Sequence, residues 1–212
     1  MEFYPGSSTR QDGKIVGGYK PIEHLSKEQE EFQKAYIKHI KKNMYFKTDI
    51  NAKAHEKLLE VAKSRKLDTK KAIFIGVHVR KTDHADFVKR QLNLEPIYDE
   101  YYNDGMDYFR DNYDNCVFIV ASDDIEWCKK HIDTSKEDVV FSESNPTFYR
   151  DKDGNLRDED NSKAAYDLVL LSSCNHTVVS RGTFSFWVAM LAGGECFTEN
   201  GIIVPPQHYG QS

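Results

Sequence analysis

Short runs of apolar and β-branched residues recur along the chain from residue 73 onward. The clearest are IFIGVHV at residues 73–79 and CVFIVA at residues 116–121, in which nearly every residue is apolar. Runs of this length without polar alternation are typical of strands buried on both faces of a sheet. The same pattern predicts strands at residues 73–79, 116–121, 139–141, 176–180 and 202–204.

Segments with helical periodicity stand between and before these runs. Ser26 and Gln29 have the spacing of a capping box. Phe32, Tyr36 and Ile40 form an apolar stripe after them, which predicts a helix ending near residue 43. Further helices are predicted at residues 54–66, 97–113, 123–132, 161–172 and 183–191.

The alternation of buried strands with helices predicts the fold class. Apolar strands that alternate with helices form a parallel sheet covered by helices on both faces. We therefore expect an α/β protein with a doubly wound, Rossmann-type sheet over about residues 70–205. Such sheets bind ligands at the carboxyl ends of their strands, so the residues directly after each strand are the candidates for chemistry.

Composition narrows the class of function. The chain has 212 residues, of which 39% are hydrophobic and 30% charged, which allows a packed core and argues against wholesale disorder. The net charge is −5, whereas nucleic-acid binders usually carry a basic surface, so no nucleic-acid partner is expected. Residues 1–20 lack an apolar run of signal-peptide length and no run of about 20 apolar residues occurs, so the chain is expected to be soluble.

Cysteine usage argues against a structural metal site. No CxxC pair occurs, and no histidine stands at zinc-finger spacing from a cysteine pair, so we expect no structural zinc site. Two possibilities stay open, four buried thiols or one or two disulfides. The residues concerned are Cys116, Cys128, Cys174 and Cys196.

The first predicted strand leads into a charged segment that contains His78, Arg80, Lys81 and Asp83. An arginine can bind a phosphate or diphosphate through two N–H groups at once, and a lysine adds a point charge. A phosphate site is therefore one interpretation of this segment. The other is a simple surface ion pair between Arg80 and Asp83.

The second predicted strand leads into Ser122, Asp123 and Asp124, and three interpretations stay open. Carboxylates beside bound phosphates can hold Mg²⁺. Ser122 or Asp123 can instead be an ordinary cap of the next helix. One of the two aspartates can also accept hydrogen bonds from guanine, whose N1–H and N2 amino group are adjacent donors.

The segment SRGTFS at residues 180–185 opens a predicted helix. A glycine followed by hydroxyl residues at a helix start can bind an anion through backbone N–H groups and side-chain donors. The alternative is a serine or threonine cap with no ligand. GxGxxG, Walker and GxSxG motifs are absent from the sequence.

Three segments agree in order, spacing and local detail with a known set of motifs. They are GVHVRKTD at residues 76–83, VFIVASDDIEWC at 117–128 and DLVLLSSCNHT at 167–177, the last continuing through GTFSFW at 182–187 to LAGG at 191–194. Together they resemble the galactoside α-1,2-fucosyltransferases, glycosyltransferase family 11. The resemblance covers about residues 70–205.

The resemblance implies a GT-B-like glycosyltransferase. Residues 1–69 would be a short, partly helical remnant of the acceptor-side region, and residues 70–212 the Rossmann-type domain that binds GDP-fucose. The implied reaction is inverting transfer of L-fucose from GDP-fucose to the 2-hydroxyl of a galactose in a glycan, with no cofactor and no essential metal. The implied location is the Golgi lumen or membrane, with any membrane anchor outside this chain.

The resemblance also implies residue roles. Arg80 would contact the diphosphate and stabilise GDP as the leaving group, where charge develops. Asp83 is the candidate general base, or else it orients Arg80. Asp123 or Asp124 would read guanine. Donor contacts are implied for His78, Arg80, Lys81, Ser122, Asp123, Asp124, Thr183, Phe184 and Ser185.

Two departures from the family pattern raise alternatives. Lys81 and Thr82 stand where the family usually has a second arginine and a small residue, and lysine lacks the bidentate geometry of arginine. Little of the family's N-terminal half precedes residue 70. The alternatives are a catalytically inactive GDP-sugar-binding or lectin-like relative, a fucosyltransferase with a different acceptor, and a generic α/β nucleotide-binding protein.

Overall fold

The structure is a computed structural model that describes part of the chain. The predicted N-terminal helix lies largely outside the described residues, although residues 35, 38–40 and 43 are helical. Asp83 lies outside them too, as does the predicted turn at Asp153 and Gly154. The described residues are 9–11, 14–16, 35, 38–40, 43–82, 88–93, 96–143, 148–150, 152, 156–158, 161–199 and 201–203.

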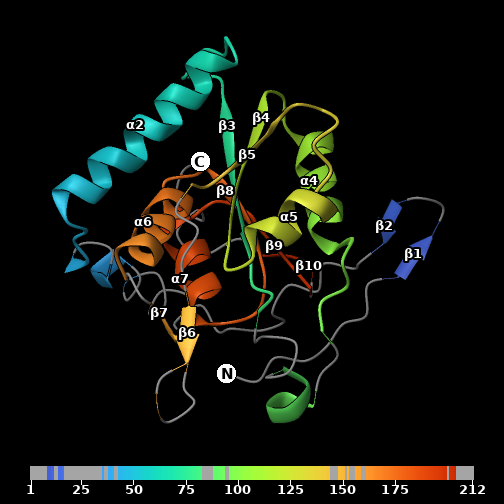
Figure 1. The fold of residues 1–212 in the computed structure, drawn as a ribbon. Helices are drawn as coiled ribbons and strands as arrows, with labels where there is room; N and C mark the ends of the chain where they lie inside the picture. The colour runs from blue at the N-terminus through green and yellow to red at the C-terminus, as the bar shows by residue number, and fades with distance from the viewer. Residues whose placement is uncertain are drawn as a thin grey trace.

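A six-stranded sheet with the order β10-β9-β8-β3-β4-β5 forms the centre of the fold (Figure 1). All five predicted strands are confirmed, each with bounds within one residue. A sixth strand, β9, was not predicted because its three residues are too few for a recognisable apolar run. The strands are β3 (Ile73–Val79), β4 (Cys116–Ser122), β5 (Val139–Phe141), β8 (His176–Val179), β9 (Cys196–Thr198) and β10 (Gly201–Ile203).

Neighbouring strands are parallel from β9 to β5, as predicted. β10 differs, because it pairs antiparallel with β9. Residues 199–200 are the whole connection between these two strands, and so short a link permits a hairpin but no crossover. The sheet is therefore parallel with one antiparallel edge strand.

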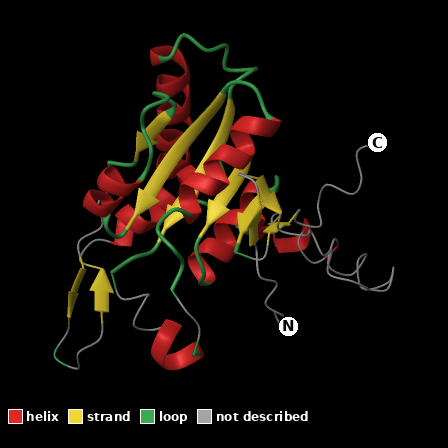
Figure 2. Ribbon diagram, turned by 90° about the vertical axis from the view of Figure 1, so that its right-hand side faces the viewer, coloured by secondary structure: helices red, strands yellow, loops and turns green. Residues whose placement is uncertain are grey.

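Helices cover both faces of the sheet, which confirms the doubly wound prediction (Figures 1 and 2). One face carries α2, α6 and α7, and the other carries α4 and α5. A short π-helical turn, η1 (Val88–Leu92), precedes α4. The helices are α2 (Thr48–Ser64), α4 (Tyr101–Asn112), α5 (Ile125–His131), α6 (Asn161–Ser172) and α7 (Thr183–Ala192).

Two small antiparallel pairs lie apart from the main sheet. Neither was predicted, because each strand has three residues. The pairs are β1 (Thr9–Gln11) with β2 (Lys14–Val16), and β6 (Phe148–Arg150) with β7 (Leu156–Asp158). The division of the chain at residue 69 stays a prediction, and α2 shares one hydrophobic core with α6 and α7.

The alternation of side chains along β3 decides what each face can carry. Ile75, Val77 and Val79 are fully buried against α4 and α5. Residues 74, 76 and 78 therefore face α6 and α7. At Gly76 an added Cβ would lie 3.0 Å from the backbone oxygen of Leu171 in α6, so this close approach favours glycine. The next residue on that face, His78, lies beneath the start of α7.

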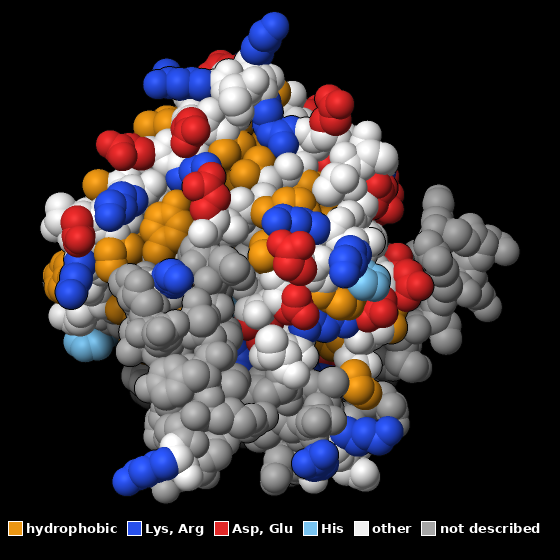
Figure 3. Space-filling view, viewed as in Figure 1, with side chains coloured by type: hydrophobic (Ala, Val, Ile, Leu, Met, Phe, Trp, Pro, Cys, Tyr) orange, Lys and Arg blue, Asp and Glu red, His pale blue; other side chains and the backbone are white. Residues whose placement is uncertain are grey.

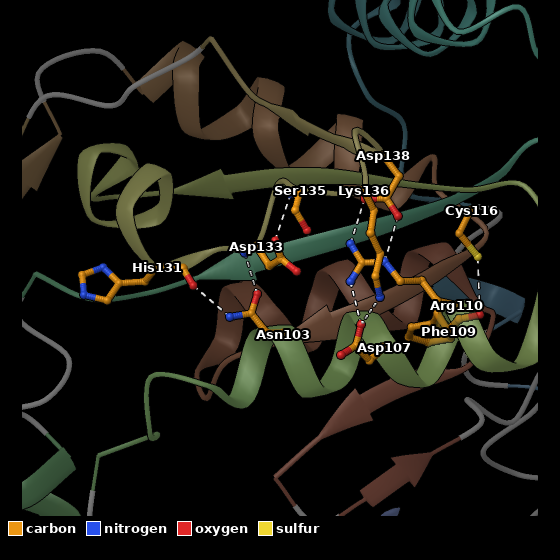
Figure 4. A network of polar contacts seen from close by, with 10 residues as sticks. All are labelled: Asn103, Asp107, Phe109, Arg110, Cys116, His131, Asp133, Ser135, Lys136 and Asp138. Carbon is orange, nitrogen blue, oxygen red and sulfur yellow. Dashed lines mark hydrogen bonds and ion pairs between the residues drawn. The ribbon is translucent and has the colours of Figure 1, made fainter. Parts of the chain in front are cut away.

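A polar network ties α4 to the segment between α5 and β5 (Figure 4). Arg110 donates from Nε and Nη2 to the two carboxylate oxygens of Asp138 at 2.8 and 2.7 Å. Its Nη1 also donates to Asp107 at 2.8 Å. About two helical turns before Arg110, Asn103 Nδ2 donates to the carbonyl of His131, and Asn103 Oδ1 accepts from the N–H of Asp133, both at 2.8 Å. The network fastens one side of α4 along most of its length.

All four cysteines are free thiols, which decides between the two possibilities left open by the sequence. Three are buried, and burial raises the pKa of the Cys128 thiol, for example, to about 11.

Among the described residues no cluster of three or more His, Cys, Asp or Glu side chains could hold a metal ion. Within the same residues, no helix has the length and apolar character to cross a membrane.

Charge is mixed on the visible surface. On the face seen in Figure 3, the acidic and basic side chains of the described residues are interspersed over α2, α4 and α5. Exposed ion pairs such as Lys129 with Glu126 contribute to this pattern. Mixed charge on this face is in keeping with the net charge of −5.

Candidate functional site

Three parallel strands end at one edge of the sheet and bring the predicted residues together. His78 in β3 is paired with Ala121 in β4 and with Val179 in β8. The segments that follow these strands, beginning at Arg80, Asp123 and Ser180, therefore lie side by side. This is the edge at which parallel α/β sheets bind ligands.

Asp123 contacts the three residues that follow β3. Its Oδ1 accepts from the backbone N–H of Lys81 at 2.8 Å. Its Oδ2 accepts from the N–H and Oγ1 of Thr82 at 3.2 and 2.5 Å. Arg80 Nε lies 3.3 Å from the same Oδ2, and the Asp123 side chain is only 3% exposed. The ion pair seen here for Arg80 is thus with Asp123, and a pair with Asp83 stays a prediction.

The capping expectation for Ser122 or Asp123 is wrong. The N-cap of α5 is Asp124, whose Oδ1 accepts from the N–H of Trp127 at 3.0 Å. Ser122 Oγ instead accepts from the N–H of Asp124 at 2.9 Å. The helix starts at Ile125, two residues later than predicted, and Asp123 is engaged with the segment after β3 instead.

His78 joins β3 to the first turn of α7. Its Nδ1 lies 2.7 Å from Ser185 Oγ, and its ring lies 4.5 Å from the ring of Phe184. Ser180 Oγ donates to the His78 carbonyl at 3.2 Å and lies 3.4 Å from Nδ1. The His78 side chain is buried, so this polar cluster forms part of the floor of the site.

The start of α7 has the geometry of an anion site. Gly182 is the N-cap with φ 124° and ψ 167°, and no side chain caps the helix, so the serine or threonine cap is wrong. The N–H groups of a first helical turn have no partner within the helix and lie at the positive end of its dipole. Thr183 is exposed at this turn, while Ser185 is buried against His78.

The Lys81 ammonium contacts two side chains of the protein. Its Nζ lies 2.6 Å from Asp99 Oδ1 and 3.7 Å from the centre of the Trp127 ring. The ring of His131 also stacks on Trp127, with the two ring centres 4.2 Å apart. Lys81 therefore links the segment after β3 to α5 through a cation–π contact.

Three further residues lie at this edge. Ser180 and Arg181 belong to the SRGTFS segment that the sequence singled out, but the sequence assigned neither of them a role. Arg181 forms a two-point ion pair with Glu199 that ties the ends of β8 and β9 together. Tyr102 in α4 gave no sequence signal.

The Tyr102 hydroxyl is a buried donor without a hydrogen bond in the described part of the chain. Ser180 and the backbone of Arg80 are among its polar neighbours. Burial raises the pKa of Tyr102 above its ordinary value, so the group stays a neutral phenol. The hydroxyl lies beneath the edge that carries the predicted site residues.

Comparisons with known proteins identify the family. The family model described as Glycosyl transferase family 11 matches residues 14–205. Over 122 residues the chain is 39% identical to galactoside alpha-(1,2)-fucosyltransferase 1 of Sus scrofa, 37% to that of Alouatta belzebul and 36% to that of Saimiri sciureus.

Each of these matches covers 58% of this chain and 30% of the relative, so the matched region spans under a third of the relatives' length. No solved structure matches the chain. The six-stranded, mostly parallel α/β sheet is the Rossmann-like fold of GT-B enzymes. The chain belongs to glycosyl transferase family 11.

Proposed function

We propose that this chain is the donor-binding part of a galactoside α-1,2-fucosyltransferase. The enzyme would transfer L-fucose from GDP-fucose to the 2-hydroxyl of a galactose in a glycan, with inversion at the fucose anomeric carbon. The observation that carries the proposal is the juxtaposition of Arg80, His78 and the start of α7 at the carboxyl edge of the parallel strands. Family membership and the names of the relatives support it.

The diphosphate would bind between Arg80 and the first turn of α7. Arg80 supplies a planar, permanently charged donor, and the turn from Thr183 to Ser185 supplies backbone N–H groups. Phe184 packs on His78 and so holds that turn in place. Lys81 adds positive charge to the same segment, although its ammonium pairs with Asp99.

Guanine would be read by Asp124. Asp124 Oδ1 caps α5, and the described part of the chain offers Oδ2 no partner. Asp123 is fully engaged with residues 80–82. Ser122 holds the N–H of Asp124 and so orients this carboxylate.

The reaction breaks the bond between the fucose anomeric carbon and the GDP oxygen. The electron pair stays on the β-phosphate, where Arg80 and the α7 dipole stabilise the growing negative charge. The galactose 2-hydroxyl forms the new bond from the opposite face, and its proton passes to a general base. Asp83 is the candidate base from the sequence. No metal is needed in this scheme.

The rest of the assignment follows from the motif resemblance. Residues 1–69 would belong to the acceptor side and residues 70–212 to the donor side. The partners would be GDP-fucose and a galactose-terminated glycan. The location would be the Golgi.

The proposal is tested by calorimetric titration with GDP in the presence of EDTA. Wild type should bind GDP in the micromolar range, more tightly than ADP or UDP, and Arg80→Ala should bind at least tenfold more weakly. Lys129→Ala removes an equally positive, exposed side chain on α5 and should bind like wild type. A folded wild type that binds no GDP would contradict the proposal.

A second candidate is a GDP-sugar-binding or lectin-like relative without activity. It is favoured by one observation, that Lys81 stands where the family usually has a second arginine and directs its ammonium to Asp99. Turnover of GDP-fucose with a galactoside acceptor would exclude it. Profiling other acceptors would likewise separate the proposed enzyme from a fucosyltransferase with a different acceptor.

A further inference from the structure

Asp123 accepts hydrogen bonds from three donors of Lys81 and Thr82 and forms an ion pair with Arg80. The N–H of Lys81 and the N–H and Oγ1 of Thr82 donate at 2.8, 3.2 and 2.5 Å, and Arg80 Nε lies 3.3 Å from Asp123 Oδ2. The carboxylate comes from the end of β4, while all its donors come from the segment after β3. One buried side chain thus contacts each of residues 80–82, the first three residues after β3.

The contact at Nε bears directly on how Arg80 can bind a ligand. A guanidinium is planar, and bidentate binding of a phosphate requires this plane to have one orientation. The ion pair at Nε, together with the bonded backbone of residues 81 and 82, restricts that orientation. Binding groups held in this way lose less entropy when the ligand arrives.

The same contacts argue against a direct role for Asp123 in reading guanine. To accept from guanine, the carboxylate would have to release some of the donors it now holds. One of these is the N–H of Lys81, which makes a part-buried bond to a side chain that is only 3% exposed. Leaving a buried donor without a partner carries a desolvation cost, which a new contact to guanine would have to offset.

We infer that Asp123 is a positioning residue, which acts on the donor diphosphate through Arg80, while Asp124 next to it reads the base. The inference rests on the proposed function and divides the two adjacent carboxylates between two tasks. It replaces the open choice between Asp123 and Asp124 with a definite assignment.

The test is a double-mutant cycle read out by calorimetric titration with GDP and with inosine diphosphate, which lacks the N2 amino group of guanine. The variants are wild type, Arg80→Ala, Asp123→Asn and the double variant. Asp123→Asn should weaken GDP binding about tenfold, as for the loss of a charge-assisted hydrogen bond. In the Arg80→Ala background the same change should cost less than about twofold. The preference for GDP over inosine diphosphate should stay as in wild type.

Two results would overturn the inference while leaving the proposed function intact. One is loss of the preference for GDP over inosine diphosphate in Asp123→Asn, which would make Asp123 the base-reading residue. The other is an equal loss of affinity in both backgrounds, because the two residues would then act independently. If folded wild type bound no GDP, the proposed function would fail and this inference with it.

Two further variants distinguish a specific loss of GDP affinity from a general loss of stability. Asp138→Asn removes a carboxylate that holds Arg110 in the network of Figure 4, so it should lower stability but leave GDP affinity unchanged. If Asp123→Asn does not fold, Thr82→Val keeps the side-chain shape and removes only the 2.5 Å contact to Asp123. It should weaken GDP binding in the same direction by a smaller factor, and this effect too should disappear with Arg80→Ala.

Discussion

His78 Nδ1 and Ser185 Oγ lie 2.7 Å apart, although 107 positions separate the two residues in the chain. The contact is buried and joins the end of β3 to the first turn of α7. Through it, the strand that leads into Arg80 and the helix start that would receive a diphosphate become one rigid unit.

Ser185→Ala should therefore lower both stability and donor affinity. Loss of one buried hydrogen bond with an unpaired partner costs about 1–3 kcal/mol, which urea unfolding would register. GDP titration should show weaker binding. Ser172→Ala is the matched control, because Ser172 Oγ is buried without a hydrogen-bond partner in the described structure. If both variants lost equal stability, the His78–Ser185 contact would contribute no more to stability than a buried hydroxyl without a hydrogen bond.

Gly182→Ala should destabilise the protein through backbone strain alone. An added Cβ at Gly182 meets no atom within 4 Å, but φ is 124°, a conformation that L-residues rarely adopt. The expected cost is about 1–2 kcal/mol in thermal or urea unfolding. GDP binding should weaken as well, because Gly182 caps α7.

Gly201→Ala provides the comparison for that variant. Gly201 has φ 101° and equally open space, but it lies at the start of β10. A similar loss of stability with unchanged GDP affinity is expected. Unchanged affinity in Gly182→Ala as well would argue against an anion site at α7.

Tyr101→Phe should destabilise the protein, whereas Tyr102→Phe should not. Tyr101 donates to the carbonyl of Val179 at 2.8 Å, with the carbonyl of Phe197 at 3.1 Å, so its loss should cost about 1–2 kcal/mol. Tyr102 has no such bond within the described residues, so its change to phenylalanine should be neutral or stabilising. A marked loss of stability in Tyr102→Phe would indicate a partner for its hydroxyl.

The contribution of Asp107 to stability should depend on pH. Burial by itself raises the pKa of Asp107, but hydrogen bonds from Arg110 and Lys136 outweigh it, and the pKa lies below the ordinary 3.8. A carboxylate with a lowered pKa in the folded state stabilises the protein above its unfolded pKa, and this is lost as pH falls through the folded value.

Asp107→Asn should thus cost less than about 1 kcal/mol at pH 7, because the side chain is half exposed, and nothing well below pH 3.8. Urea unfolding at the two pH values measures this difference. Asp111→Asn, an exposed aspartate on the same helix, serves as control. A cost that did not change with pH would contradict the ion-pair explanation.

Local patterns were sufficient for most secondary structure. β3 and β4 were predicted closely because long, unbroken apolar runs occur where a strand is covered on both faces. α2 begins at Thr48, six residues before its predicted start, because its first turn is polar and no side chain caps it. β9 was missed because its pairing with β8 and β10, rather than its three residues, makes it a strand.

For the site, the sequence by itself determined which segments matter, because polar residues that directly follow buried parallel strands must meet at one edge. It singled out His78, Arg80 and Asp123 in this way. Only the tertiary structure decided which side chains meet: that Asp123 holds Arg80, that Asp124 caps α5, and that Lys81 points to Asp99. Asp123 and Arg80 lie 43 positions apart, and Lys81 and Asp99 lie 18 apart, so packing rather than sequence spacing brings these partners together. Packing also decides which of the two adjacent aspartates caps α5.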